Sequence, residues 1–260
     1  MTCWQKNNRT GAMHMAQEIL QLQKYMEEAE LVTFFGGAGV STESGIPDYR
    51  SKNGRYTQMK EQDEDPRKIL NRRYLLNHPE DFFKRRESNK KINPQPNHAH
   101  RVLAQMEKAG KDIRVLTQNV DGLHQKAGHR FVLELHGNAR TWFCMTCGRV
   151  YQPDEIERDE KDVPRCYVDG GIVRPNVTYF GENPKKHVMA EAKEVMRQSD
   201  LLVIAGTSLT VYPVKNLIHN FEGERVVVIN DEPLKTGDLS VNLFIQKPVG
   251  ETFEKLALNL

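Results

Sequence analysis

Residues 34–51 read FFGGAGVSTESGIPDYRS, and this stretch decides the fold that the sequence predicts. It completes an apolar run that begins at Leu31 and is long enough for a buried strand. Small residues follow at 36–39, where missing side chains let backbone N–H groups approach an anion such as phosphate. Residues 41–43 favour the start of a short helix, whose N-terminus also attracts anions. Strand, glycine turn and helix start together predict a phosphate-binding loop.

The stretch departs from the common nucleotide-binding fingerprints. A bare GxG is more often a turn without a ligand, the GxGxxG motif would need a glycine at Thr42, and no P-loop lysine is present. An ordinary dehydrogenase is therefore disfavoured. The loop at 44–50 carries the aromatic ring of Tyr49 beside the cation of Arg50, which is unusual for a plain nucleotide site.

Composition limits the possible classes of protein. A chain of 260 residues suggests one large domain or a domain with an inserted module. The net charge of +2 does not by itself indicate nucleic-acid or membrane binding, and no apolar run is long enough to predict a membrane span. Residues 1–10 lack the apolar core of a signal peptide. The four cysteines do not form a disulfide pattern, so we expect a reducing cytoplasm.

Further apolar runs predict a parallel sheet covered on both faces. They lie at 113–117, 131–135, 201–205 and 225–229, with a possible sixth strand at 242–246. The five clear strands end in GGAG, QNVD, HGN, GTS and ND. Ligands bind beyond the carboxyl ends of parallel strands, near the switch in strand order. Five small or polar strand ends therefore predict a site at that edge.

The remaining segments predict helices, loops and two insertions. Residues 1–13 are expected to be disordered, 14–30 and 250–260 helical, 52–65 a mobile loop and 66–91 two short helices, and Asn97 is expected to cap a helix. The predicted fold is α/β, with a doubly wound, Rossmann-like parallel sheet formed by 14–54, 96–139 and 179–260. A helical insertion at 55–95 and a zinc-ribbon insertion at 140–178 are expected to form a smaller domain.

The cysteine spacing predicts a structural zinc site. Cys144 and Cys147 form a CxxC pair, and Cys166 follows after eighteen residues. Asp169 stands where a fourth cysteine would complete the pattern. A carboxylate can ligate zinc, although it is a harder ligand than a thiolate. Water as the fourth ligand, or loss of the metal, remain alternatives, whereas a redox CxxC is disfavoured by the third cysteine.

The whole set of motifs closely resembles the bacterial-type sirtuins, which are NAD-dependent protein-lysine deacylases. The resemblance runs from about residue 31 to 231. Its sequence motifs come in the family's order: GAGVSTESGIPDYR, TQNVDGLH, LHGN, the CxxC pair followed by the single Cys166, GGIVRPNVTYFGE, GTSLTVYPV and VVVIND. The resemblance implies NAD as co-substrate, zinc as a structural metal and an acylated-lysine protein or peptide as partner.

The resemblance also implies which residues form the site. His136 is the general base, and Asn119 and Asp121 are the other catalytic residues. The residues that hold NAD are Gly37, Ala38, Gly39, Ser41, Thr42, Tyr49, Arg50, Gln118, Asn119, Val120, Asp121, His136, Gly206, Thr207, Ser208, Asn230, Asp231 and Val249. The substrate peptide pairs with a strand that contains Val177, Tyr179, Phe180, Gly181 and Glu182. The implied zinc ligands are Cys144, Cys147, Cys166 and Asp169.

The expected reaction removes acetyl or another neutral acyl group and yields nicotinamide and O-acyl-ADP-ribose. Sirtuins that prefer succinyl-lysine share a tyrosine and an arginine shortly after the glycine turn, and residues 54–57 do not reproduce that pair in its order. A mono-ADP-ribosyltransferase with the same NAD site is the main alternative, and a non-catalytic NAD sensor is a second one. His136 favours deacylation, because a simple transferase does not need that base.

Overall fold

A six-stranded parallel sheet forms the centre of the computed structural model, which describes residues 3–51, 54–61, 64–88 and 93–256. The strand order is β11-β10-β9-β1-β2-β3. The strands are β1 Leu31–Gly36, β2 Asp112–Thr117, β3 Val132–Glu134, β9 Leu201–Ala205, β10 Arg225–Ile229 and β11 Leu243–Ile245. In the register of the sheet, Phe34 of β1 lies opposite both Val115 and Val203. The parallel sheet predicted from the apolar runs is confirmed.

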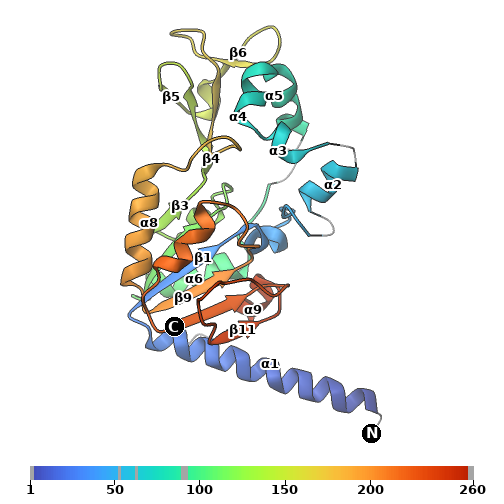
Figure 1. Cartoon of the computed structure of the whole chain (residues 1–260), viewed down its shortest axis with the longest axis vertical. Coiled ribbons are helices and arrows are strands. Elements are labelled where there is room, and N and C mark those ends of the chain that lie inside the picture. The colour runs from blue at the N-terminus through green and yellow to red at the C-terminus, as the bar shows by residue number, and fades with distance from the viewer. Residues whose placement is uncertain (1–2, 52–53, 62–63, 89–92, 257–260) are drawn as a thin grey trace.

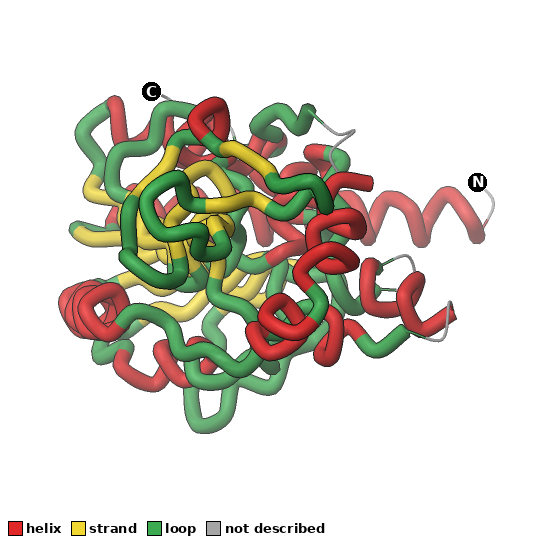
Figure 2. Tube along the Cα trace, turned by 90° about the horizontal axis from the view of Figure 1, so that it is seen from above, coloured by secondary structure: helices red, strands yellow, loops and turns green. Residues whose placement is uncertain are grey.

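Successive residues of each strand bury their side chains on opposite faces, so both faces need a cover. The face that carries Phe34 packs against α1 Cys3–Glu28, α6 His98–Lys108 and α9 Val249–Glu254. The face that carries Phe35 packs against α8 Lys186–Gln198 and the 3-10 helix η3 Val214–Asn220. Figure 2 shows the strands in the middle of the view with helices to either side.

A second module lies at one end of the molecule, at the top of Figure 1. Its helices are α2 Arg55–Glu61, α3 Pro66–Ile69, α4 Arg72–Asn77 and α5 Pro79–Ser88. Its strands are β4 Gly137–Cys144, β5 Val150–Tyr151, β6 Glu157–Arg158, β7 Pro164–Arg165 and β8 Val173–Val177, with the 3-10 helix η2 Pro153–Glu155. Leu75, Phe82 and Phe83 share one buried cluster with Trp142 and Tyr151, so segments from both insertions build one core.

Several local predictions were wrong. Helix α1 begins at Cys3, within the segment expected to be disordered, and projects beyond the rest of the chain (Figures 1 and 2). Extending a packed helix costs far less than nucleating one, so an apolar pattern is not needed there. Helix α2 lies in the expected loop, and three short helices replace the expected two between 66 and 88. Helix α8 was not predicted.

Other local predictions are confirmed. The side chain of Asn97 caps α6 by accepting the N–H of Ala99 at 3.0 Å. The closing helix spans Val249–Glu254, and residues 257–260 of its expected range lie outside the described residues. Among the described residues, no helix is long and apolar enough to cross a membrane.

Candidate active site at the strand ends

Side-chain hydrogen bonds join the carboxyl ends of neighbouring strands. Nε2 of Gln118, after β2, donates to Oγ1 of Thr207, after β9, at 3.0 Å. The N–H of Thr207 donates to Oδ1 of Asn230, after β10, at 3.0 Å. The chain leaves β1 toward β2 and β3 on one side and reaches β9, β10 and β11 on the other, so the strand order reverses beside β1. The polar strand ends therefore meet at the switch point, where such sheets bind ligands.

The turn after β1 packs directly against the turn after β9. The amides of Gly37 and Gly39 donate to the carbonyls of Ala205 and Gly206 at 3.0 and 2.7 Å. A Cβ added at Gly37 would lie 2.7 Å from both the Gly206 oxygen and the Thr207 Cβ, so a side chain cannot fit there. The glycines are needed for this close approach, and the amides of Gly37 and Gly39 are already occupied. The prediction that these two amides approach a phosphate is therefore wrong.

The 3-10 helix η1 Ala38–Ser44 follows this turn and supplies a buried hydroxyl to the site. Oγ of Ser41 donates to Oδ2 of Asp121 at 2.7 Å. Nδ2 of Asn119 lies 3.0 Å from both Oγ of Ser41 and the carbonyl of Gly37. Oδ1 of Asp121 accepts the N–H of Leu123 at 2.9 Å. Asn119 and Asp121 are thus held in fixed orientations by partners on both sides.

His136 follows β3 and has one defined tautomer when neutral. Its Nδ1 lies 3.1 Å from the carbonyl oxygen of Gln118. Because a carbonyl only accepts hydrogen bonds, Nδ1 carries the proton and Nε2 keeps its lone pair. Burial lowers the pKa of His136, and the hydrogen bond to Gln118 opposes this shift. The imidazole is therefore neutral near pH 7 and able to act as a general base.

Aromatic and cationic side chains gather on the loop after η1. The rings of Tyr49 and Tyr56 lie 5.0 Å apart, and the Arg50 guanidinium lies 5.5 Å from the centre of the Tyr56 ring. Nη1 of Arg50 also donates to Oγ of Ser208 at 3.1 Å, which ties this loop to the end of β9. Burial raises the pKa of Tyr56 to about 12, so its hydroxyl stays protonated. Tyr56 packs 6.4 Å from the ring of Phe180, which contributes to the edge predicted to receive substrate.

The segment predicted to bind substrate leaves the site beside His136, whose carbonyl accepts the N–H of Thr178 at 2.8 Å. At Phe180 one edge is already paired, because its N–H donates to Leu70 and its carbonyl accepts from Arg72, both at 3.0 Å. The Tyr179 side chain is buried in the second module against Phe82, away from the strand ends. Any contribution of Tyr179 to peptide binding must therefore come from its backbone.

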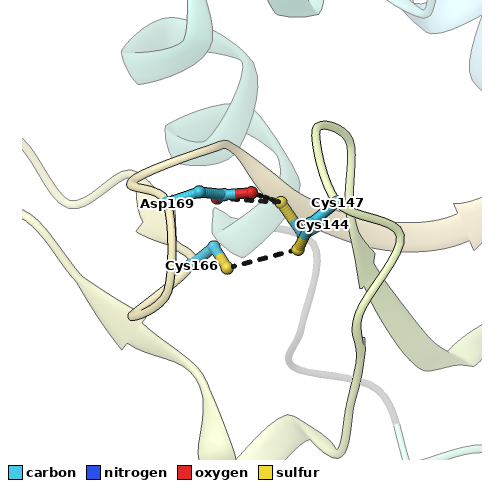
Figure 3. Close-up of side chains that lie close together, drawn as sticks. All are labelled: Cys144, Cys147, Cys166 and Asp169. Atoms are coloured by element: carbon cyan, nitrogen blue, oxygen red, sulfur yellow. Dashed lines mark hydrogen bonds between the residues drawn. The ribbon is translucent and has the colours of Figure 1, made fainter.

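The four predicted metal ligands lie together in the second module, as Figure 3 shows. Their ligand atoms all lie within 4.8 Å of one another. The Sγ atoms of Cys147 and Cys166 are 3.8 Å apart, and Sγ of Cys144 lies 3.4 Å from Oδ1 of Asp169. A tetrahedral zinc with Zn–S bonds of about 2.3 Å and a Zn–O bond of about 2.1 Å needs S–S and S–O separations of roughly 3.8 and 3.6 Å. Three thiolates and one carboxylate therefore fit a tetrahedral zinc.

Hydrogen bonds within the module support the Asp169 position. Its Oδ1 accepts the N–H of Gly171 at 2.8 Å, and this bond is the main reason why the pKa of Asp169 falls to about 2. A Cβ added at Gly171 would lie 2.8 Å from Sγ of Cys144 and 2.9 Å from Oδ1 of Asp169. The glycine thus leaves the space that the ligand atoms occupy.

Some predicted cofactor-binding residues make no direct bond to this network. Thr42 is exposed and donates to the Gly39 carbonyl at 3.0 Å, Asp231 is exposed, and Val249 is buried in the core at the start of α9. The backbone of Val120 accepts the N–H of Ala139 at 3.0 Å. Their part in NAD binding stays a prediction.

Two residues that shape the site were not predicted to do so. Nδ2 of Asn97 donates to the carbonyl of Val40 at 2.7 Å, so the residue that caps α6 also fixes η1. The Glu43 carboxylate accepts the N–H groups of Gly250 and Glu251, the latter at 2.9 Å, and ties η1 to α9. These contacts span long stretches of sequence, and no local motif indicates them.

Comparison with known proteins identifies the family. A model described as the Sir2 family matches residues 37–213, which is more than half of the chain. The chain belongs to the Sir2 family. The resemblance to the sirtuins is thereby confirmed.

Curated relatives and solved structures agree with this assignment. An NAD-dependent protein deacetylase of Clostridium acetobutylicum is 38% identical over 243 residues, covering 93% of this chain and 99% of the relative. One of Cutibacterium acnes is 42% identical over 235 residues, covering 89% and 94%. A Sir2 structure with a p53 peptide and NAD+ is 32% identical with a TM-score of 0.79, covering 91% of this chain and 95% of that one. A Sir2 structure bound to acetylated peptide is 29% identical, also with a TM-score of 0.79, covering 92% and 96%.

Proposed function

We propose that this Sir2-family protein is an NAD-dependent protein-lysine deacetylase. The observation that carries the proposal is His136, a neutral imidazole with Nε2 free, fixed beside the Gln118–Asp121 loop at the switch point of the sheet. The names of the relatives support the same activity. A mere NAD sensor would not need a base oriented in this way.

NAD is the co-substrate, and the strand ends are its proposed binding site. Gln118 and Asn119 hold the ribose next to nicotinamide, and Asp121 binds the carboxamide. Thr207, Ser208 and Asn230 line the adenosine half. The remaining predicted contacts are Gly37, Ala38, Gly39, Ser41, Thr42, Tyr49, Arg50, Val120, Gly206, Asp231 and Val249. Because the amides of Gly37 and Gly39 are occupied, their part is to give NAD space rather than hydrogen bonds.

The proposed reaction consumes acetyl-lysine, NAD and one water and releases lysine, nicotinamide and O-acetyl-ADP-ribose. Nicotinamide leaves C1′ of the ribose as the acetyl amide oxygen attacks from the other face. Nε2 of His136 then removes a proton from a ribose hydroxyl, which attacks the former amide carbon. The C–N bond to lysine breaks, and the imidazolium returns its proton to the amine. Water then adds to the acyl carbon that bridges the two ribose oxygens, and one of these C–O bonds breaks to leave the acetyl ester. Asn119 and Asp121 position the nicotinamide side for this sequence.

The substrate peptide is proposed to add as a strand along residues 177–182. Backbone hydrogen-bonding groups of successive residues in an extended chain point to opposite edges. On one edge Phe180 already pairs with Leu70 and Arg72, so the peptide is proposed to pair along the other edge of this segment, before the turn in which Gly181 has a φ of 82°. Acetyl or another neutral acyl group is the proposed acyl class, because residues 54–57 do not reproduce the tyrosine and arginine of succinyl-preferring sirtuins in their order.

Zinc is proposed to be structural. Cys144, Cys147, Cys166 and Asp169 would hold it and tie the two halves of the ribbon together. These four ligands lie in the module proposed to comprise 55–95 and 140–178. The strand-end residues 37–41 and 118–121 belong to the other domain. Thiol ligands of this kind stay reduced in the cytoplasm, which is the proposed location.

Product analysis tests the proposed function. The protein is incubated with NAD and an acetyl-lysine peptide, and mass spectrometry follows the peptide, nicotinamide and ADP-ribose species. Deacetylation predicts equal amounts of deacetylated peptide, nicotinamide and O-acetyl-ADP-ribose. ADP-ribosylated peptide or protein with the acetyl group retained would favour the transferase instead, and NAD binding without turnover would favour a sensor.

A further inference from the structure

A cavity of about 300 Å³ lies on the second module between α3 and α4. Arg67, Lys68 and Arg73 line it together with His78 and Tyr74. The side chains of Arg67, Lys68 and Arg73 are exposed. The whole chain has a net charge of only +2, so this group of three permanent cations is a local feature and not a reflection of overall composition.

Within the described part of the chain, the cations of this cavity have no partner of opposite charge. Among the residues that the structure describes, no carboxylate forms an ion pair with Arg67, Lys68 or Arg73. Asp81 accepts the hydroxyl of Tyr74 at 2.7 Å but is itself paired with Arg85. Like charges that share a wall repel one another, so an anionic occupant would stabilise the arrangement.

The cavity adjoins the segment proposed to bind substrate. Asn71, which also lines the cavity, forms a parallel bridge with Phe180. A Cβ added at Gly181 would lie 3.4 Å from Oδ1 of Asn71. The cavity therefore lies behind the edge of residues 177–182 that Leu70 and Arg72 already occupy, and not on the edge proposed for the peptide. A flank of the peptide that runs past the end of this segment, at about 3.3 Å per residue, would reach it.

We propose that this cavity binds aspartate or glutamate side chains on one side of the acetyl-lysine and makes the enzyme prefer substrates with an acidic flank. The inference rests on the proposed function, because it takes residues 177–182 as the peptide-binding edge. Arginine and lysine bind carboxylates by charge-assisted hydrogen bonds, with arginine adding a bidentate geometry. Because each of the three cations can pair with one carboxylate, the cavity is expected to prefer a short run of acidic residues to a single one.

The test uses acetyl-lysine peptides with one core and three neutral, three glutamate or three lysine residues placed before or after it. Fluorescence anisotropy of labelled peptides gives Kd, and turnover with NAD gives kcat and KM. The glutamate flank on one side is expected to bind about three- to thirty-fold more tightly than the neutral flank, from three exposed ion pairs. The difference appears in Kd and KM with kcat unchanged. It shrinks as salt rises, because exposed charges are screened.

Charge reversal at two positions provides the decisive variant. Arg67 and Arg73 are each the second residue of a helix, where a glutamate suits the helix dipole, so Arg67→Glu with Arg73→Glu is expected to fold. The double variant should lose the preference for the glutamate flank and favour the lysine flank, with neutral-flank peptide bound and turned over as before. Lys193→Glu, at an exposed position of α8, is the matched control and should keep the original preference.

The outcomes separate this inference from the proposed function. Equal Kd for glutamate and neutral flanks in the unaltered protein overturns the inference, even if both peptides are deacetylated. Retention of the glutamate preference in the double variant, or its loss in Lys193→Glu, overturns it as well. A charge-dependent preference in Kd without any turnover would uphold the inference and refute the deacetylase function. If a short oligonucleotide binds at these cations while the peptides show no flank preference, the inference is overturned and the cavity binds nucleic acid instead.

Discussion

Three histidines that the proposed chemistry does not use lie in the core beside β1. The side chains of His100, His124 and His129 are buried, and the rings of His100 and His124 lie 4.6 Å apart. Burial lowers the pKa of His100 to about 4 and that of His124 well below its usual value. Burial also lowers the pKa of His129, although the Glu107 carboxylate opposes that shift. All three are neutral at pH 7 and must stay neutral for the core to remain packed.

This cluster predicts that the protein loses stability in mild acid. Below about pH 6.5 the histidines take up protons in the unfolded chain but not in the folded one. Each such group lowers the free energy of unfolding by up to about 1.4 kcal/mol per pH unit as pH falls toward the folded pKa. Urea unfolding at pH 7.5, 6.5 and 5.5 measures this slope. His124→Leu should make the slope shallower, whereas His187→Leu, at an exposed position of α8, should leave it unchanged. A slope equal in all three proteins would contradict the prediction.

At the scale of single elements, the ribbon depends on its metal. Cys144→Ser should lower the Tm and the bound zinc together, because a structural site contributes its binding energy to folding. Asp169→Ala is expected to weaken zinc binding, measured by competition with a chelator, and Asp169→Cys to restore or exceed the original affinity. Zinc affinity that is unchanged in Asp169→Ala would remove Asp169 from the ligand set. Purified protein without zinc by elemental analysis would refute the site itself.

Helix α6 and the 3-10 helix η1 are coupled through one residue. The Asn97 side chain caps α6 at Ala99 and also donates to the Val40 carbonyl. Asn97→Ala removes both bonds and leaves a buried carbonyl unpaired, so it should cost about 1–3 kcal/mol in the free energy of unfolding. KM for NAD should rise as well, because η1 loses a support. Exposed Asn183→Ala is the control, and equal stability of the two variants in urea would refute this coupling.

At the scale of the whole molecule, the sheet and the position of the site could be predicted, because they depend on properties that each segment carries alone. Apolar runs specify buried parallel strands, and parallel strands bring their polar ends to one edge. Asn97 was recognisable as a cap for the same reason. The four metal ligands could be predicted to cluster from their spacing.

What could not be predicted depends on contacts between distant segments. The amides of Gly37 and Gly39 are occupied by the turn after β9, which lies far along the chain. Helix α2 has no apolar period and is held by Tyr56, whose N–H donates to the Tyr49 carbonyl at 2.8 Å and whose ring packs near Phe180. The cation-lined cavity forms only when α3 and α4 come together, so its residues look like ordinary surface charges in the sequence.

The strand-end site is proposed to deacetylate lysine with His136 as the base. Two rates measured on the same variants test this role: deacetylation, and exchange of labelled nicotinamide into NAD in the presence of acetyl peptide. His136→Ala should lower deacetylation about 10²–10⁴-fold, because general base catalysis is lost, while NAD still binds and slow exchange persists. Asp121→Ala should suppress both rates, because nicotinamide is no longer positioned. Deacetylation by His136→Ala at a rate close to that of the unaltered protein would rule out His136 as the base.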